Sequence, residues 1–208
     1  MALIMYLTKA PRYKNIMTNE YETISKNDIG LIDKYFSWGM AREDGGRYSC
    51  DTLEEWCGIP ESQLPHKYIV NYYRDFFTEK NAYREMIGEC KRYTIFEHLA
   101  RIVKANQIFE WFIKNVMNGE INKEYYDISK EQLTELLYTC KQVVSEGVVK
   151  ENEAKEMLPL MENTGYFFGT SEYNNIYAIQ VTDMIKILEN VLSTTDFEKE
   201  AVYFNATW

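Results

Sequence analysis

Histidine, cysteine and proline are all scarce in this sequence, which contains two, four and four of them among 208 residues. Neither histidine lies in an H-E-x-x-H motif and the cysteines lack C-x-x-C spacing, so no pattern indicates a zinc site. A G-x-S-x-G nucleophile elbow is also missing. We therefore expect no metal and no cofactor, and a binding protein is more expected than an enzyme.

Long apolar runs and an excess of positive charge are missing as well. No run approaches the roughly 20 apolar residues that span a bilayer, and the N-terminus has no signal-peptide pattern. The sequence thus predicts a cytoplasmic protein with reduced cysteines and no membrane contact. Its formal net charge of −9 argues against non-specific nucleic-acid binding and favours a basic partner surface.

Aromatic residues, in contrast, are abundant: they make up 15% of the chain and include 17 tyrosines and 10 phenylalanines. Such a composition predicts a core rich in rings, with tyrosine hydroxyls at its rim where partners can bind. The chain has no internal repeat, low-complexity tract or long linker. One domain spanning residues 1–208 is therefore expected.

The hydrophobic patterns predict a mainly α-helical fold of the α+β class, with a helical bundle and a small sheet. Residues 2–7 form a short apolar run and residues 201–208 alternate at a period of two, so both chain ends are expected to be strands that pair. The run 164–169 is expected to add a third strand. Helices are expected over residues 29–39, 53–58, 67–90 with a break at 78–81, 94–118, 130–146, 152–158 and 172–192.

One polar residue, Asn106, stands on the apolar stripe of the helix expected over residues 94–118. A buried amide is costly unless its donors and its acceptor are paired. Asn106 is therefore interpreted either as the anchor of a buried network that fixes packing or as a ligand contact. Lys104 and Trp111 flank it and join it as candidate binding residues.

The aromatic string at residues 165–171 supplies the second set of candidates. The amides of Gly169, Thr170 and Ser171, at the expected start of a helix, are suited to an anion or a partner carboxylate, although ordinary capping explains the same residues. Tyr166 and Phe168 would form an aromatic ligand wall, or else they are core residues. Both interpretations of this string stay open at the level of sequence.

A charged connection at residues 39–49 contains Arg42 and Arg47 beside two acids, Glu43 and Asp44, and two consecutive glycines. It matches no phosphate-binding loop pattern. We predict a flexible loop there, with the two arginines as candidate partner contacts.

Three strings of this sequence resemble those of an uncharacterised family of small proteins encoded by tailed phages and prophages. The family pattern consists of a K-A-N-x-I-x-x-W-F helix, a G-x-F-F-G-[ST] turn followed by a tyrosine, and a C-terminal tryptophan. The likeness covers roughly residues 100–208, although Phe109 stands where related sequences often carry histidine. The matching residues are Lys104, Ala105, Asn106, Ile108, Trp111, Phe112, Gly165, Phe167, Phe168, Gly169, Thr170, Tyr173, Thr207 and Trp208.

This resemblance implies a phage setting rather than a particular reaction. Together with the composition, it favours a phage accessory protein that acts in the host cytoplasm by binding a host or anti-phage defence protein. An alternative is a protein that sequesters a small ligand such as a signalling nucleotide, with Asn106, Trp111 and the turn at 166–170 as pocket walls. The lowest-ranked alternative is a hydrolase that uses carboxylates.

Overall fold

The structure, a computed structural model, describes residues 2–43, 54, 67–76, 83–87, 90–162 and 165–208. Within these ranges the chain forms six helices and a four-stranded antiparallel sheet. The predicted α+β class is therefore confirmed. The narrower description as a mainly helical bundle remains a prediction.

Two compact units can be distinguished among the described residues. The first consists of Met1–Thr8 and His98–Trp208, and the second consists of Lys9–Glu97. Strand β1 (Ile4–Pro11) runs from the first unit into the second. The single domain expected from the sequence remains a prediction, and all candidate residues except Arg42 and Arg47 belong to the first unit.

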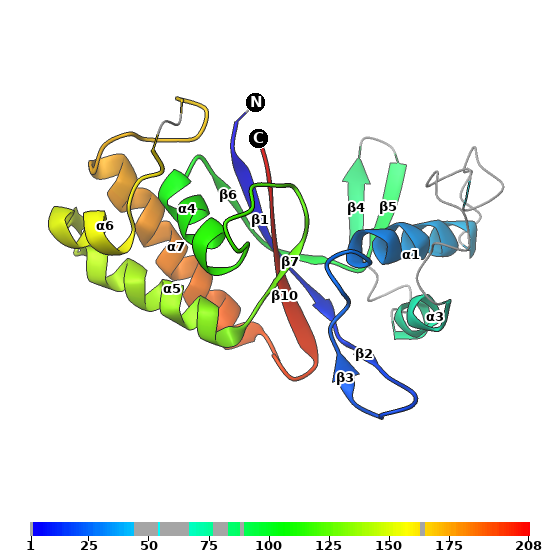
Figure 1. The fold of residues 1–208 in the computed structure, drawn as a ribbon. Helices are drawn as coiled ribbons and strands as arrows, with labels where there is room; N and C mark the ends of the chain where they lie inside the picture. The colour runs from blue at the N-terminus through cyan, green and yellow to red at the C-terminus, as the bar shows by residue number, and fades with distance from the viewer. Residues whose placement is uncertain (1, 44–53, 55–66, 77–82, 88–89, 163–164) are drawn as a thin grey trace. The chain divides into compact units, whose positions relative to one another are not determined.

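The sheet has the strand order β6-β1-β10-β7, with β6 at Glu97–Val103, β7 at Tyr126–Ile128 and β10 at Glu200–Thr207. The neighbouring positions of β1 and β10 confirm that the two chain ends pair. Four helices gather on one side of this sheet (Figure 1). They are α4 (Asn106–Asn115), α5 (Lys130–Val143), α6 (Glu151–Met157) and α7 (Asn175–Thr194).

Aromatic rings fill the core of the first unit, as the composition predicts. The rings of Phe112 and Phe204 are stacked with their centroids 4.0 Å apart, and Phe109 lies 5.7 Å from the ring of Trp208. Burying a large apolar side chain of this kind stabilises a fold by about 1.5–3 kcal/mol. These contacts hold the C-terminal strand against α4.

Helix α5 begins at residue 130, as expected from the sequence, and a capping box precedes it. The Ser129 hydroxyl accepts a hydrogen bond from the Gln132 amide at 3.1 Å, and the Gln132 side chain accepts one from the Ser129 amide at 2.9 Å. This helix ends at Val143, before the expected end at residue 146. Glu146 and Gly147 both have positive φ, as this kind of tight turn requires, and they form a hairpin turn between β8 (Val144–Ser145) and β9 (Val148–Val149).

Two expected helices are in part strands. Residues 97–103 form β6 instead of the first part of a helix, and residues 83–87 and 90–94 form the antiparallel strands β4 (Tyr83–Ile87) and β5 (Cys90–Thr94). Among the described residues of the stretch 67–90, the expected helix is present as α3 (Lys67–Phe76). The apolar residues of a short segment fit the helical period as well as the strand period. Pairing with distant strands decides between helix and strand, and the local sequence does not reveal that pairing.

The run at 164–169 is not a strand of the sheet, which is a further correction. Residues 166–168 form a turn, and Gly169 makes a single bridge to Ala105. Ser171 is not the cap of α7, because that helix begins at Asn175 and Asn174 caps it.

In the second unit, α1 (Ile29–Glu43) buries Ile29, Ile32 and Phe36 as predicted and continues beyond the expected end at Gly39. The hairpin of β2 (Tyr13–Lys14) and β3 (Tyr21–Glu22) precedes it. Residues 44–49 of the predicted loop and the helix expected over 53–58 lie outside the described residues, except for residue 54. None of the described helices has the length and apolar character needed to cross a bilayer.

Candidate functional site

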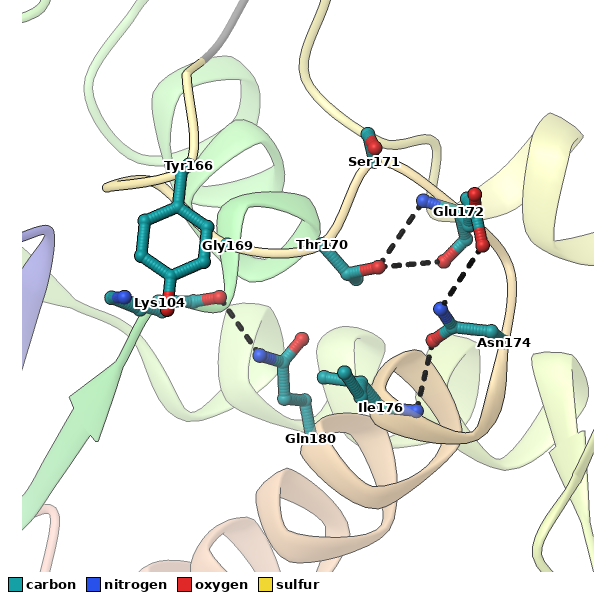
Figure 2. A pocket seen from close by; sticks show the side chains of 9 residues that line it. All are labelled: Lys104, Tyr166, Gly169, Thr170, Ser171, Glu172, Asn174, Ile176 and Gln180. Carbon is teal, nitrogen blue, oxygen red and sulfur yellow. Dashed lines mark hydrogen bonds between the residues drawn. The ribbon is translucent and has the colours of Figure 1, made fainter.

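A cavity of about 470 Å³ opens in the first unit between the end of β6, the 165–174 segment and the start of α7. We name it the Lys104 pocket, and Figure 2 shows its walls. Four of the predicted binding residues line it together although they come from two separate strings of sequence. The lining residues are Lys104, Tyr166, Gly169, Thr170, Ser171, Glu172, Asn174, Ile176 and Gln180.

The backbone at Lys104 determines the shape of this pocket. Lys104 joins β6 to α4 with a positive φ of 56°, and its carbonyl accepts a hydrogen bond from the Gln180 side chain at 2.8 Å (Figure 2). Gly169 packs directly against that carbonyl: a Cβ at position 169 would lie 1.9 Å from the Lys104 oxygen. Gly169 also has a φ of 133°, so no other residue fits there without a backbone shift.

Asn106 holds the turn at residues 166–170 in place through hydrogen bonds of its side chain. Its side chain is fully buried, Nδ2 donates a hydrogen bond to the Thr170 carbonyl at 2.8 Å, and Oδ1 accepts one from the Met161 amide at 3.3 Å. The residue is the first of α4 and not part of a stripe inside a longer helix. This pairing supports the interpretation of Asn106 as a structural anchor, because both ends of the amide are occupied.

The chemistry inside the pocket combines one cation, one carboxylate, one exposed ring and several hydroxyls. The Lys104 ammonium lies 3.9 Å from the centroid of the Tyr166 ring, and that tyrosine is 80% exposed. Lys104 makes no ion pair with any described residue. A cation–π contact at an exposed position is worth only about 0.5–1 kcal/mol, so the ammonium remains available to an anionic group.

The 170–174 side of the pocket is held by its own hydrogen bonds. The Thr170 hydroxyl donates to the Glu172 carbonyl at 3.1 Å, and the Asn174 side chain donates to the Glu172 carboxylate at 3.4 Å. Asn174 Oδ1 accepts from the amide of Ile176 at the beginning of α7 (Figure 2) and also from that of Tyr177. The prediction of a helix start at Gly169–Ser171 is therefore wrong, and the first amides of the real helix are already capped.

Phe168 and Tyr173 do not line the Lys104 pocket. The Phe168 ring packs 6.5 Å from that of Phe109 as a partly buried core residue. The Tyr173 hydroxyl accepts a hydrogen bond from the Leu160 amide at 3.2 Å. Both residues support the segment that carries Tyr166.

The two predicted arginine contacts belong to the other part of the chain. Arg42 lies in the last turn of α1, with its guanidinium 5.4 Å from the centroid of the Trp38 ring. Arg47 lies outside the described residues. Their role as partner contacts remains a prediction.

Sequence reasoning missed Gln180, which connects three parts of the site. Besides its bond to Lys104, Gln180 accepts a hydrogen bond from the buried side chain of Gln107 at 3.0 Å. No motif marks Gln180, because it lies on an otherwise ordinary turn of α7 and meets its partners only in the folded chain. Glu172, Asn174 and Ile176 were missed for the same reason.

Trp111 lines a second cavity, of about 290 Å³, which we name the Trp111 pocket. The lining residues are Glu110, Trp111, Lys114, Asn115, Glu135, Thr139, Glu156, Met157, Leu158 and Pro159. Three glutamates thus share one pocket. Even so, no group of three or more histidine, cysteine, aspartate or glutamate side chains among the described residues is arranged to hold a metal ion.

The buried groups between α5 and α7 offer no nucleophile. Burial raises the pKa of the Cys140 thiol to about 12, so this cysteine is a neutral thiol at physiological pH. Burial also raises the pKa of Tyr177, whose hydroxyl donates to the Leu158 carbonyl at 2.8 Å. Both groups act as packing and hydrogen-bonding elements.

When the chain is compared with protein-family models, with curated proteins and with solved structures, nothing matches. The resemblance to a phage-encoded family therefore remains a prediction that rests on its three strings of sequence.

Proposed function

We propose that this protein is a non-enzymatic binding protein and that it contacts a partner protein around the Lys104 pocket. The observation that carries this proposal is a group of four exposed apolar side chains: Tyr166 and Ile176 line the pocket, Phe167 is in ring contact with Tyr166, and Ile179 lies one turn after Ile176 on α7. Tyr166, Phe167, Ile176 and Ile179 are 80%, 55%, 54% and 60% exposed. These four are a third of the twelve large apolar side chains that are exposed among the described residues, yet they lie between residues 166 and 179.

Exposed apolar groups beside polar ones are typical of protein-interaction surfaces. Tyrosine is especially effective there, because its ring contributes a large contact area at a small cost in conformational entropy. The turn that presents Tyr166 and Phe167 is fixed by Gly169 and Asn106. A surface already held in one conformation loses little entropy on binding, which favours affinity.

The resemblance to phage-encoded proteins gives this proposal its biological setting. In that setting the partner is a host or anti-phage defence protein met in the host cytoplasm. The net charge of −9 favours a partner with a basic surface.

Site-directed photo-crosslinking in a host lysate tests this proposal. A photoreactive phenylalanine analogue replaces Phe167 in one sample and Tyr138 in the control, because Tyr138 is a similarly exposed aromatic residue on α5, away from the pocket lining. We expect a discrete adduct from position 167 and none from position 138. Equal labelling from both positions, or none from 167, would contradict the proposal.

A second candidate function is the binding of a small anionic ligand, such as a signalling nucleotide, in the Lys104 pocket. Two observations favour it: the volume of about 470 Å³ lies within the range of small-molecule sites, and Lys104, which forms no ion pair with a described residue, places its ammonium beside the Tyr166 ring. A ligand at about 100 times its Kd would stabilise the fold by about 2.7 kcal/mol.

Thermal unfolding with a panel of nucleotides separates this candidate from the first. We expect an increase in Tm that disappears in Lys104→Gln and persists in Lys186→Gln, a control that removes an exposed lysine of the same unit. A flat response over the whole panel would rule out nucleotides while leaving the crosslinking test unaffected.

A further inference from the structure

The Trp111 pocket is built from three helices and is separate from the Lys104 pocket, since the two share no lining residue. Helix α4 contributes Trp111, α5 contributes Glu135 and Thr139, and α6 contributes Glu156. Its volume of about 290 Å³ lies just below the range of ordinary ligand sites. This size suits one long side chain of a partner better than a complete cofactor.

Two nearly buried polar groups in this pocket have no hydrogen-bond partner within the part of the chain that the structure describes. Trp111 and Thr139 are each only 6% exposed, and neither the indole N–H nor the threonine hydroxyl makes a hydrogen bond with any described residue. Neither atom is among the unpaired side-chain atoms that are sealed from solvent. Both groups line the pocket, so we infer that they open into it and can donate to an acceptor on a bound molecule.

The carboxylates of the pocket supply a negative charge that is only partly compensated. Glu110 pairs with Lys114 at 2.9 Å, whereas Glu135 and Glu156 have no ion-pair partner among the described residues. The two unpaired carboxylates come from different helices and flank the same cavity. They would attract an organic cation that enters between them.

We propose that the Trp111 pocket binds a lysine or arginine residue of a basic peptide segment. The ammonium or guanidinium group pairs with Glu135 and Glu156, and a peptide carbonyl of the same segment accepts hydrogen bonds from the Trp111 indole and the Thr139 hydroxyl. The aliphatic part of the side chain lies against the apolar wall at Met157–Pro159. One basic residue of the partner would thus provide an ion-pair partner for both carboxylates and a hydrogen-bond acceptor for both donors of the pocket.

Nuclear magnetic resonance of the ¹⁵N-labelled full chain tests this proposal through the indole N–H resonance of Trp111. The ligands are three blocked tripeptides, acetyl-Gly-Xaa-Gly-amide, with lysine, arginine or glutamine at the centre. We expect the lysine and arginine peptides to shift the Trp111 resonance saturably, and the glutamine peptide to leave it in place. Pentylamine, which has the cationic arm but no carbonyl, is expected to bind several-fold more weakly.

Charge-neutral variants then locate the site. Glu135→Gln and Glu156→Gln are each expected to weaken lysine-peptide binding about threefold to fivefold, as the loss of one exposed ion pair would. The matched control is Glu153→Gln, which removes an exposed glutamate of α6 outside the pocket lining and is expected to leave affinity unchanged. All three positions are exposed, so these variants should fold.

Three outcomes would overturn the proposal: no shift of the Trp111 resonance with either basic peptide, an equal shift with the glutamine peptide, or equal weakening by the control variant. None of them depends on the Lys104 pocket. The crosslinking experiment at Phe167 can therefore succeed or fail independently.

Discussion

Two turns of the first unit need a glycine at positive φ, but different interactions fix them. Gly147, with φ at 76°, has no atom within 4 Å of where a Cβ would stand, and its hairpin is determined by the two adjacent strands. Gly169, with φ at 133°, lies against the Lys104 carbonyl, and Asn106 holds the next residue from 64 positions earlier in the chain. The first turn is thus local, whereas the Lys104 pocket exists only after distant segments have met.

Replacing each glycine by alanine should separate these two cases most clearly. We expect Gly169→Ala to reduce the free energy of unfolding by about 3–5 kcal/mol, because the strained φ and the overlap with the Lys104 carbonyl both oppose a Cβ. Gly147→Ala meets only the φ penalty and should cost about 1–2 kcal/mol. Urea denaturation measures both values, and similar losses at the two positions would show that the close approach of Gly169 to Lys104 contributes little.

Removing the anchor behind the pocket is the next largest expected effect. Asn106→Ala leaves the Thr170 carbonyl and the Met161 amide without their partner in a buried place, which should cost about 2 kcal/mol. Hydrogen exchange of the amides in the 165–170 turn should accelerate in this variant. Asn190→Ala, at an exposed asparagine of α7 whose side chain makes no hydrogen bond with any described residue, serves as the control and should change stability by no more than about 0.5 kcal/mol.

The capping box of α5 is an interaction between residues close in sequence, and its removal tests whether such an interaction affects the Lys104 pocket. Ser129→Ala removes the hydroxyl that accepts from the Gln132 amide and should cost about 1 kcal/mol. Since this cap is made within four residues, the exchange rates of amides around the Lys104 pocket should stay as they are. Faster exchange at Gly169 or Thr170 would mean that α5 and the pocket open together.

The same distinction explains how much of the fold the sequence predicts. The start of α5 and the terminal strands follow from patterns that a few neighbouring residues complete, and the structure has them. Strand β6 was mistaken for helix because its hydrogen bonds go to β1, nearly a hundred residues earlier by sequence. Short apolar segments of this kind carry too little local information to choose between the two periods.

The candidate site was partly predictable for a related reason. The strings around Lys104 and Tyr166 stand out by composition, and the structure brings them together in one pocket. Gln180 and Glu172 have no such signal. Whether Gln180 and Glu172 line the Lys104 pocket depends on the position of α7. This helix starts at the Asn174 cap and not at the expected residues 169–171.

Lys104 offers the smallest and most selective test, because its side chain and its backbone act in opposite directions. Lys104→Gln removes the contact with the Tyr166 ring and should cost about 0.5–1 kcal/mol. Lys104→Gly removes the same contact but also relieves a φ of 56° that is unfavourable for any residue with a Cβ, so it should be about 1 kcal/mol more stable than the glutamine variant. Paired urea curves measure this difference. If the glycine variant is the more stable one, glycine at position 104 would be about as stable as the natural lysine, and a binding role for the ammonium in the Lys104 pocket explains why lysine is present. If the two variants are equally stable, the backbone at Lys104 is unstrained and this support for the binding role is lost.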